Sequence, residues 1–275
     1  DACRALANNT CGSQEKFVDK MNALVKKLGL KDSHFVNTTG IHDPDHYTTA
    51  YDMAKITQYA LQNEKFVEIF TRYQYNASNG LHQWVKKVLY TCKRDHMNVS
   101  MIEGCKSGYT SDAQHTLSSM INVNNHHYIC VVGNKDGYNH CTVNDTITLG
   151  NYVGSHYKEV NLLQSGNEVT KTSVNDGEKS KVAIKIDQDI NIVLPNDYNE
   201  KDIEYKQKVK TFTAPVKKDQ NAGKLDVYYK ENKLGSYTLS TVNNVAESES
   251  VIMFRKIKNI LIPCVITVFI CIVVL

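Results

Sequence analysis

One short run, Lys106-Ser107-Gly108-Tyr109, contains residue types that can hold the carboxylate of an acyl-peptide. An ammonium and a hydroxyl on one strand can hold a carboxylate together, and a glycine beside them lets a substrate approach the backbone. The backbone N–H of Tyr109 can then complete an oxyanion hole. We therefore expect Lys106, Ser107 and Gly108 to bind substrate, and Tyr109 to act through its backbone.

Two other groups of side chains could in principle do chemistry. His42, Asp43, Asp45 and His46 lie close together in the sequence and contain ligand types that metals prefer, but we interpret them as a solvated loop. No CxxC pair occurs among the cysteines, which argues against a zinc ribbon. Cys92 and Cys105 are compatible either with a disulfide near the candidate site or with two buried thiols.

The elements that must position these residues follow from local patterns. Apolar residues at helical spacing predict a helix from Gln14 to Leu28 with Ser13 as its N-cap, and Thr49 with Asp52 predicts a capping box that opens a helix through about Gln62. Two strands, 116–123 and 128–132, are expected to form a hairpin across Asn124-Asn125. A further helix is expected from 144 to 157, so the first domain, residues 1–157, is α+β.

After residue 158 the pattern changes from helical periodicity to alternation, as in Val182, Ile184 and Ile186. Alternation predicts half-buried strands, and turn signals between them predict a small all-β sandwich over residues 158–245. A polar linker, residues 246–256, is expected to follow. Residues 260–275 are almost wholly apolar and span roughly 24 Å as a helix, so we expect a transmembrane anchor over 257–275.

The overall composition excludes some classes of function. The 275 residues carry a formal net charge of +3, and their basic residues are scattered among acidic ones. A nucleic-acid partner is therefore not expected. The content of 41% hydrophobic and 22% charged residues is typical of a globular chain.

Beyond the short run, the sequence resembles low-molecular-mass penicillin-binding proteins, which are serine-type D-alanyl-D-alanine carboxypeptidases. Lys106-Ser107-Gly108 resembles the lysine, hydroxyl, glycine motif of that family, with Ser107 where threonine is usual. Further resemblances are Phe17 to Asn22, Leu28-Gly29-Leu30, His34-Phe35-Val36-Asn37, Thr39-Gly40, Asp43-Pro44, His46-Tyr47, Thr49-Ala50, Asp52-Met53-Ala54, Thr213-Ala214-Pro215-Val216-Lys217 and Gly223-Lys224-Leu225.

The resemblance implies a fold and a reaction. The fold is the C-terminal part of a penicillin-binding, β-lactamase-like transpeptidase domain followed by a β-domain. A Ser-x-x-Lys serine attacks a peptide ending in D-Ala-D-Ala, with a lysine as base and no cofactor or metal. The implied partners are the peptidoglycan pentapeptide and, as covalent inhibitors, β-lactams. The domains would face the extracytoplasmic side of the cell membrane, although Arg255, Lys256 and Lys258 oppose the positive-inside rule there.

The nucleophile serine and base lysine are not expected in this chain. In the family an Asp-Ala pair follows a Ser-x-Asn motif, and this sequence opens with Asp1-Ala2, so we expect the chain to start after the nucleophile and to be inactive by itself. Ser13-x-x-Lys16 matches a structural helix of the family, Ser155-x-x-Lys158 follows Lys106 in the wrong order, and Ser165-Gly166-Asn167 indicates a turn. The alternatives are a non-catalytic peptidoglycan-binding or scaffold protein of the same fold and, less well supported by the β-domain and anchor, a β-lactamase.

Overall fold

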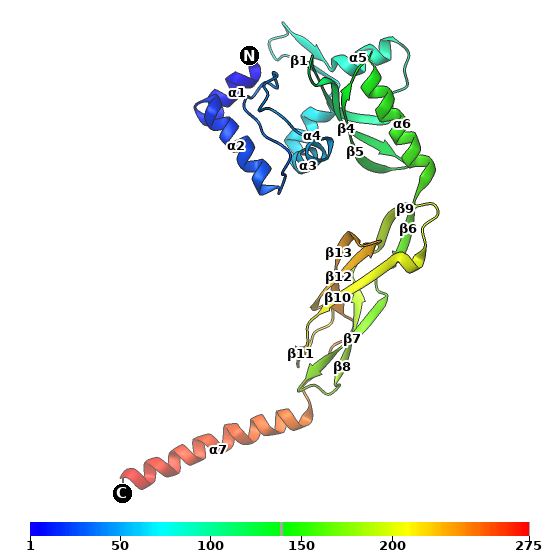
Figure 1. The fold of residues 1–275 in the computed structure, drawn as a ribbon. Coiled ribbons are helices and arrows are strands. Elements are labelled where there is room, and N and C mark those ends of the chain that lie inside the picture. Colours follow the sequence, from blue (N-terminus) through cyan, green and yellow to red (C-terminus); the bar gives the residue numbers. More distant parts are fainter. Residues whose placement is uncertain (138–139, 275) are drawn as a thin grey trace. The chain divides into compact units, whose positions relative to one another are not determined.

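The computed structural model describes the backbone of residues 1–137 and 140–274, and the side chains of these residues except 134, 135 and 263–274. The chain divides into two compact units, Asp1–His156 and Tyr157–Leu275. Helices and strands are mixed in the first unit, whereas the second has strands and one short 3-10 helix before its last helix (Figure 1).

Two helices of the first unit begin at the capping residues that the sequence indicates. Ser13 Oγ accepts the Lys16 N–H at 3.2 Å, which confirms the predicted N-cap. Thr49 caps the next predicted helix in the same way by accepting the Asp52 N–H at 3.1 Å. The helices in the described part of this unit are α1 (Ala2–Cys11), α2 (Gln14–Lys27), α3 (Ala50–Ala60), α4 (Glu64–Thr71), α5 (Lys87–Arg94) and α6 (Cys141–His156).

The carboxylate of Asp52 makes contacts other than those of a capping box. It accepts the Asp32 N–H at 3.1 Å and the Ser33 hydroxyl at 2.8 Å, so it joins α3 to the preceding loop. This contact explains why a carboxylate with only 3% exposure is tolerated there, since a buried charge needs such donors.

The three-stranded sheet of the first unit is antiparallel and ordered β3-β4-β5. Its strands are β3 (Ile102–Thr110), β4 (Gln114–Val123) and β5 (His126–Lys135). The predicted hairpin is confirmed: Asn124 and Asn125 adopt φ values of 53° and 65°, the left-handed region that asparagine tolerates in tight turns. β4 packs against α6, and the core between them contains fully buried Leu117, Ile121 and Val143.

A small hairpin precedes α5. It consists of β1 (Gln74–Asn76) and β2 (Gln83–Val85). Trp84 on β2 is 55% exposed and stacks on Tyr75 with ring centroids 6.0 Å apart.

Apart from one short 3-10 helix, the second unit is all β before its last helix, which confirms the β-domain. One sheet has the order β10-β12-β13-β8-β7-β11, and β6 pairs with β9. Residues of both sheets, among them Ile184, Ile190 and Leu239, share one buried core. The elements are β6 (Tyr157–Leu163), β7 (Glu168–Asn175), β8 (Lys181–Ile186), β9 (Ile190–Pro195), η1 (Glu200–Asp202), β10 (Ile203–Val209), β11 (Phe212–Thr213), β12 (Asn221–Tyr229) and β13 (Asn232–Thr241).

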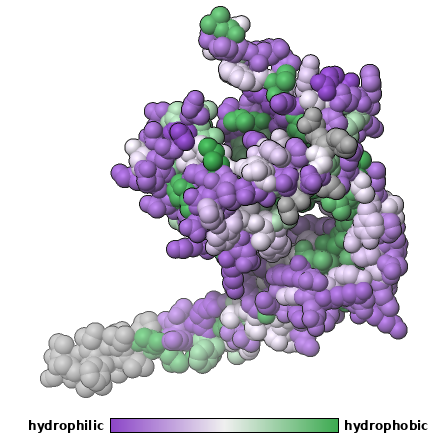
Figure 2. Space-filling view, turned by 45° about the horizontal axis from the view of Figure 1, so that its top comes forward, coloured by the Kyte–Doolittle hydropathy of each residue, from purple (hydrophilic) through white to green (hydrophobic). Residues whose placement is uncertain are grey.

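The chain ends in α7 (Glu249–Val274). Val245 and Glu247, which precede it, form bridges with Val216 and Gly177 of the β-domain. In Figure 2 the described part of α7 shows hydrophobic residues beside hydrophilic ones. Most side chains of the predicted anchor, 257–275, lie outside the described residues. Within the described ones, we find no helix that combines the length and the apolar character needed to cross a membrane.

Candidate active site

The predicted site residues lie on β3, which is an edge strand of the sheet. Lys106 pairs in register with Ser118 of β4, Ser107 with Leu117, and Gly108 with Thr116. Lys106 and Gly108 are exposed, and Ser107 is half-buried. The strand therefore presents the ammonium, the hydroxyl and the glycine along one accessible stretch.

The outer edge of β3 carries backbone groups that do not pair with β4. The carbonyl oxygen of Cys105 accepts a hydrogen bond from Lys86 Nζ at 2.8 Å, and that of Ser107 accepts one from Lys106 Nζ. Backbone groups alternate between the two edges along a strand, so the N–H of Tyr109 faces this same outer edge. The N–H groups of Ser107 and Tyr109 on this edge thus offer donors to an added peptide strand.

Gly108 has a local packing reason to be glycine. A Cβ atom built at this position would lie 2.7 Å from Thr116 Oγ1, which is closer than real Cβ atoms come. Any side chain here would also cover the strand surface between Lys106 and Tyr109. The space over the peptide backbone therefore depends on this glycine.

The far end of the strand is exposed and borders the loop before α3. The Tyr109 side chain is 62% exposed, and its ring centroid lies 4.7 Å from that of His115. His42 Nδ1 lies 3.6 Å from Asp112 Oδ2 in the turn between β3 and β4. This contact places the loop of the predicted His/Asp cluster beside the end of β3.

The other members of that loop cluster contact the loop's own backbone. His34 Nδ1 lies 2.7 Å from the Asp45 carbonyl oxygen, and His46 Nδ1 accepts the Val36 N–H at 3.2 Å. Burial lowers the pKa of His46. Among the side chains that the structure describes, no group of three or more from His, Cys, Asp or Glu is arranged to hold a metal ion.

Lys86, which precedes α5, is a site neighbour that the sequence interpretation missed. Its Nζ donates to the carbonyl oxygens of Phe70, at 2.7 Å, and of Cys105, at 2.8 Å. Burial lowers the pKa of Lys86, and the charge of Lys106 lowers it further. No local pattern distinguishes Lys86 from Lys87, so the sequence carried no signal for it.

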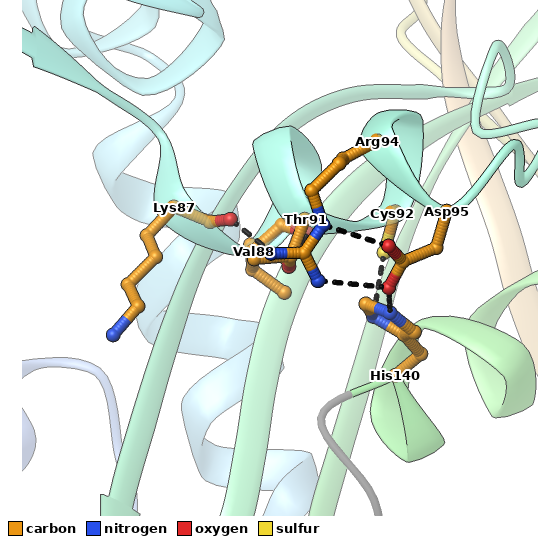
Figure 3. Close-up of polar contacts among 7 residues, drawn as sticks. All are labelled: Lys87, Val88, Thr91, Cys92, Arg94, Asp95 and His140. Carbon is orange, nitrogen blue, oxygen red and sulfur yellow. Dashed lines mark hydrogen bonds and ion pairs between the residues drawn. The ribbon is translucent and has the colours of Figure 1, made fainter.

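A second cluster, also missed, joins α5 to the residue before α6 (Figure 3). Cys92 Sγ lies 3.2 Å from His140 Nδ1, and His140 Nε2 lies 2.6 Å from Asp95 Oδ2. Arg94 donates to both carboxylate oxygens of Asp95, at 2.8 and 3.2 Å. Hydrogen bonds from Arg94 and then His140 hold the pKa of Asp95 well below its usual range.

This arrangement has the order of a thiol, imidazole and carboxylate triad but lacks the access that a nucleophile needs. Cys92 is 0% exposed, and burial raises the pKa of its thiol. A reactive cysteine needs a lowered pKa and an approach for substrate. We therefore interpret the Cys92 cluster as a structural link between α5 and α6. Cys92 and Cys105 are both free thiols.

The serines of the other Ser-x-x-Lys and Ser-x-Asn matches make local hydrogen bonds. Ser13 is the N-cap of α2. Ser155 Oγ donates to the Asn151 carbonyl oxygen at 2.9 Å. Ser165 Oγ donates to the Asp187 carbonyl oxygen at 3.0 Å within the β-domain.

A cleft of about 360 Å³ lies beside the first residues of β3 and does not include Lys106. Its lining comes from the end of α4, from α5 and from the loop that follows, and includes Tyr73, Lys93, Asn98, Ser100 and Glu103.

Comparisons with known proteins match both units. The family model described as D-alanyl-D-alanine carboxypeptidase matches residues 1–137, and the model described as penicillin-binding protein 5, C-terminal domain, matches residues 157–247. The D-alanyl-D-alanine carboxypeptidase DacD of Salmonella typhimurium is 28% identical over 94% of this chain and 64% of its own length. DacF of Bacillus subtilis is 29% identical over 82% of this chain and 57% of its own length. The chain thus spans about three fifths of these relatives.

Solved structures show the same fold. Penicillin-binding protein 5 from Haemophilus influenzae aligns with a TM-score of 0.62 at 24% identity, over 89% of this chain and 70% of its own. The peptidoglycan synthesis regulatory factor PBP3 from Streptococcus pneumoniae aligns with a TM-score of 0.71 at 21% identity, over 88% of this chain and 73% of its own. With both units matched in sequence and fold, the chain belongs to the low-molecular-mass penicillin-binding proteins of the D-alanyl-D-alanine carboxypeptidase family.

Proposed function

We propose that this chain forms the substrate-binding part of a serine-type D-Ala-D-Ala carboxypeptidase that removes the terminal D-alanine from peptidoglycan stem peptides. The observation that carries the proposal is the accessible outer edge of β3 at Ser107 and Tyr109, with the Lys106 ammonium beside it. An extended peptide can pair with such an edge as an added strand. The terminal carboxylate then lies against Lys106 and the Ser107 hydroxyl.

This placement orients the peptide for acyl transfer. The Tyr109 N–H, two residues further along the edge, donates to the carbonyl oxygen of the penultimate D-alanine. A serine Oγ forms a bond to that carbonyl carbon and gives its proton to a lysine base. The C–N bond then breaks, the leaving amine takes up the proton, and water hydrolyses the serine ester.

We assign neither the serine nor the base lysine of this reaction to a residue of the chain. The two Ser-x-x-Lys matches involve Ser13, whose Oγ caps α2, and Ser155, whose Oγ bonds within α6. We therefore expect residues 1–275 alone to bind the peptide without cleaving it. Ser107 retains the hydroxyl of the usual threonine, so the carboxylate contact is retained.

The experiment is intact-mass analysis and peptide mapping of the full-length gene product after exposure to benzylpenicillin, with residues 1–275 treated in parallel. A covalent adduct on a serine outside residues 1–275 supports the proposal. An adduct on Ser13 would show that the nucleophile was assigned wrongly. A folded full-length product that forms no adduct would favour the non-catalytic peptidoglycan-binding or scaffold protein.

We also propose that residues 257–275 anchor the protein in the cell membrane with both domains on the extracytoplasmic face. The apolar run 260–275 supports this proposal, and Arg255 to Lys258 would then meet anionic head groups. Protease added to intact cells should digest the β-domain. Protection of the β-domain, with digestion only after lysis, would contradict the proposed orientation.

A further inference from the structure

The contacts of Lys86 close the outer edge of β3 at one end of the candidate site. The Lys86 backbone is fixed by its N–H, which donates to the Tyr73 carbonyl oxygen at 2.8 Å. Its Nζ reaches from the start of α5 to the end of α4, at Phe70 O, and to β3, at Cys105 O. The same Nζ lies 5.5 Å from the centroid of the Phe70 ring.

Cys105 is the residue where an added strand would have to continue past Ser107. Its outward carbonyl oxygen is already occupied by Lys86. The end of α4 also lies against the preceding residue, because a Cβ atom at Gly104 would come within 2.9 Å of the Phe70 carbonyl oxygen. The edge is therefore closed at Cys105 by the half-buried Lys86 and the end of α4. At Ser107 the carbonyl oxygen bonds the exposed side chain of Lys106, which can turn toward a bound carboxylate, so this part of the edge stays accessible together with Tyr109.

The direction of the bound peptide means that the closed edge limits how far its C-terminal end can extend. In the proposed function, on which this inference rests, the reacting carbonyl lies at Tyr109 and the terminal carboxylate at Ser107 and Lys106. The C-terminus of the peptide thus points toward Cys105. Two residues along a strand span about 7 Å, so room remains for one residue after the reacting carbonyl and for none beyond it.

The positive charge of the two lysines also favours a peptide that ends in a free carboxylate. Lys86 Nζ bonds the carbonyl oxygen of Cys105, and Lys106 Nζ bonds that of Ser107, so both ammonium groups lie along the same edge of β3. Two cations in a partly desolvated site attract a free α-carboxylate more than a neutral amide or a continuing peptide bond.

We propose that Lys86 is a specificity-determining, positioning residue that restricts the site to peptides ending in a free α-carboxylate, by closing the edge of β3 at Cys105 and adding positive charge there. Lys86 makes no contact with the reacting atoms. It acts through the backbone of β3 and through its charge.

The test compares two blocked peptides ending in D-Ala-D-Ala, one with a free carboxylate and one with a C-terminal carboxamide. Equilibrium binding of each to residues 1–275 gives a ratio of Kd values, and cleavage by the full-length gene product gives a ratio of kcat/KM values. Because both peptides meet the same preparation, the fraction of folded protein cancels from each ratio.

Lys86→Met removes the charge and the donors at similar length, and we expect the preference for the free carboxylate to fall about tenfold. Lys86→Arg keeps a cation and should retain the preference within about twofold. Lys87→Met is the matched control, because the adjacent exposed lysine makes none of these contacts and should leave the preference unchanged.

Two results would overturn the inference: a wild-type chain that binds both peptides equally, or an unchanged preference in Lys86→Met. Failure of the proposed function is recognised separately, as the absence of a benzylpenicillin adduct on the folded full-length product. The Kd ratio decides the role of Lys86 whether or not that adduct forms.

Discussion

Cys92 Sγ lies 3.2 Å from His140 Nδ1, although 48 positions separate the two residues in the sequence. The contact joins α5 to the start of α6 and places the thiol in the core with Cys105 and Cys130. All three thiols are buried, and burial raises the pKa of Cys105 to about 11. Reagents cannot reach these thiols, and only a small fraction of each is ionised to the reactive thiolate, so all three should react slowly.

The rate of thiol alkylation should depend on how deeply each cysteine is buried. We expect iodoacetamide at pH 8 to modify exposed Cys3 at least tenfold faster than Cys92, Cys105 or Cys130, as measured by peptide mapping over time. In denaturant the difference should disappear. Rapid native modification of Cys92 would contradict its place in the core.

Asp226 should make the stability of the β-domain depend on pH. Its side chain is 3% exposed, and hydrogen bonds from Lys233, Ser236 and Lys208 hold its pKa well below the ordinary value of 3.8. The unfolded chain binds a proton more readily at this group, so the stabilisation is fully present above about pH 5 and is lost as the pH falls below 4.

The measurement is urea unfolding of wild type and Asp226→Asn between pH 7 and pH 2.5. The wild type should be more stable at neutral pH, and the difference should shrink on acidification. Asp197→Asn, at an exposed position, serves as the control and should show a small, flat difference. A difference for Asp226→Asn that grows toward acid pH would reverse the assigned sign.

Gly104 should tolerate no side chain. A Cβ atom would lie 2.7 Å from Phe70 Cδ1 and 2.9 Å from the Phe70 carbonyl oxygen, and a backbone atom cannot rotate away. We expect Gly104→Ala to lower the free energy of unfolding by about 1–3 kcal/mol. Gly133→Ala on β5, with no heavy atom within 4 Å of the added Cβ, is the matched control and should be nearly neutral. Equal effects of the two substitutions would show that α4 does not press on β3.

Ile121 should contribute strongly to the stability of the packing between β4 and α6. It is 2% exposed, and Ile121→Ala is expected to cost about 2–5 kcal/mol of unfolding free energy. Ile69→Ala removes the same atoms from a side chain that is 62% exposed, and we expect less than about 0.5 kcal/mol. Comparable losses in denaturant unfolding would place the core elsewhere.

Several features were predictable because their signals are local. The Ser13 and Thr49 caps lie within three residues of the amides they bond, so the starts of α2 and α3 were indicated correctly. Alternation predicted the strands of the β-domain in the same way. The buried face of α3 does not follow hydrophobicity alone: Thr57, which bonds Ser118 of β4 at 2.8 Å, is more buried than Met53, Ile56 or Ala60.

The hairpin β1–β2 shows where residue type alone misleads. Large aromatic residues are usually buried, so residue type alone favours a packing role for Trp84. In the structure it lies on a two-stranded hairpin, where both strands are exposed and the ring has Tyr75 and His82 as aromatic neighbours. A hairpin of three-residue strands offers no core to cover it.

By itself, the sequence determined the family, the α+β and β-rich parts, and the strand-borne order of Lys106, Ser107 and Gly108, since all of these depend on residue types at short spacing. Only the tertiary structure decided which distant groups meet there. Lys86 reaches Cys105 across 19 positions and Phe70 across 16, and identical lysines in the sequence acquire different roles only when α4, α5 and β3 pack together. Side-chain contacts between elements depend on that packing, which no local pattern encodes.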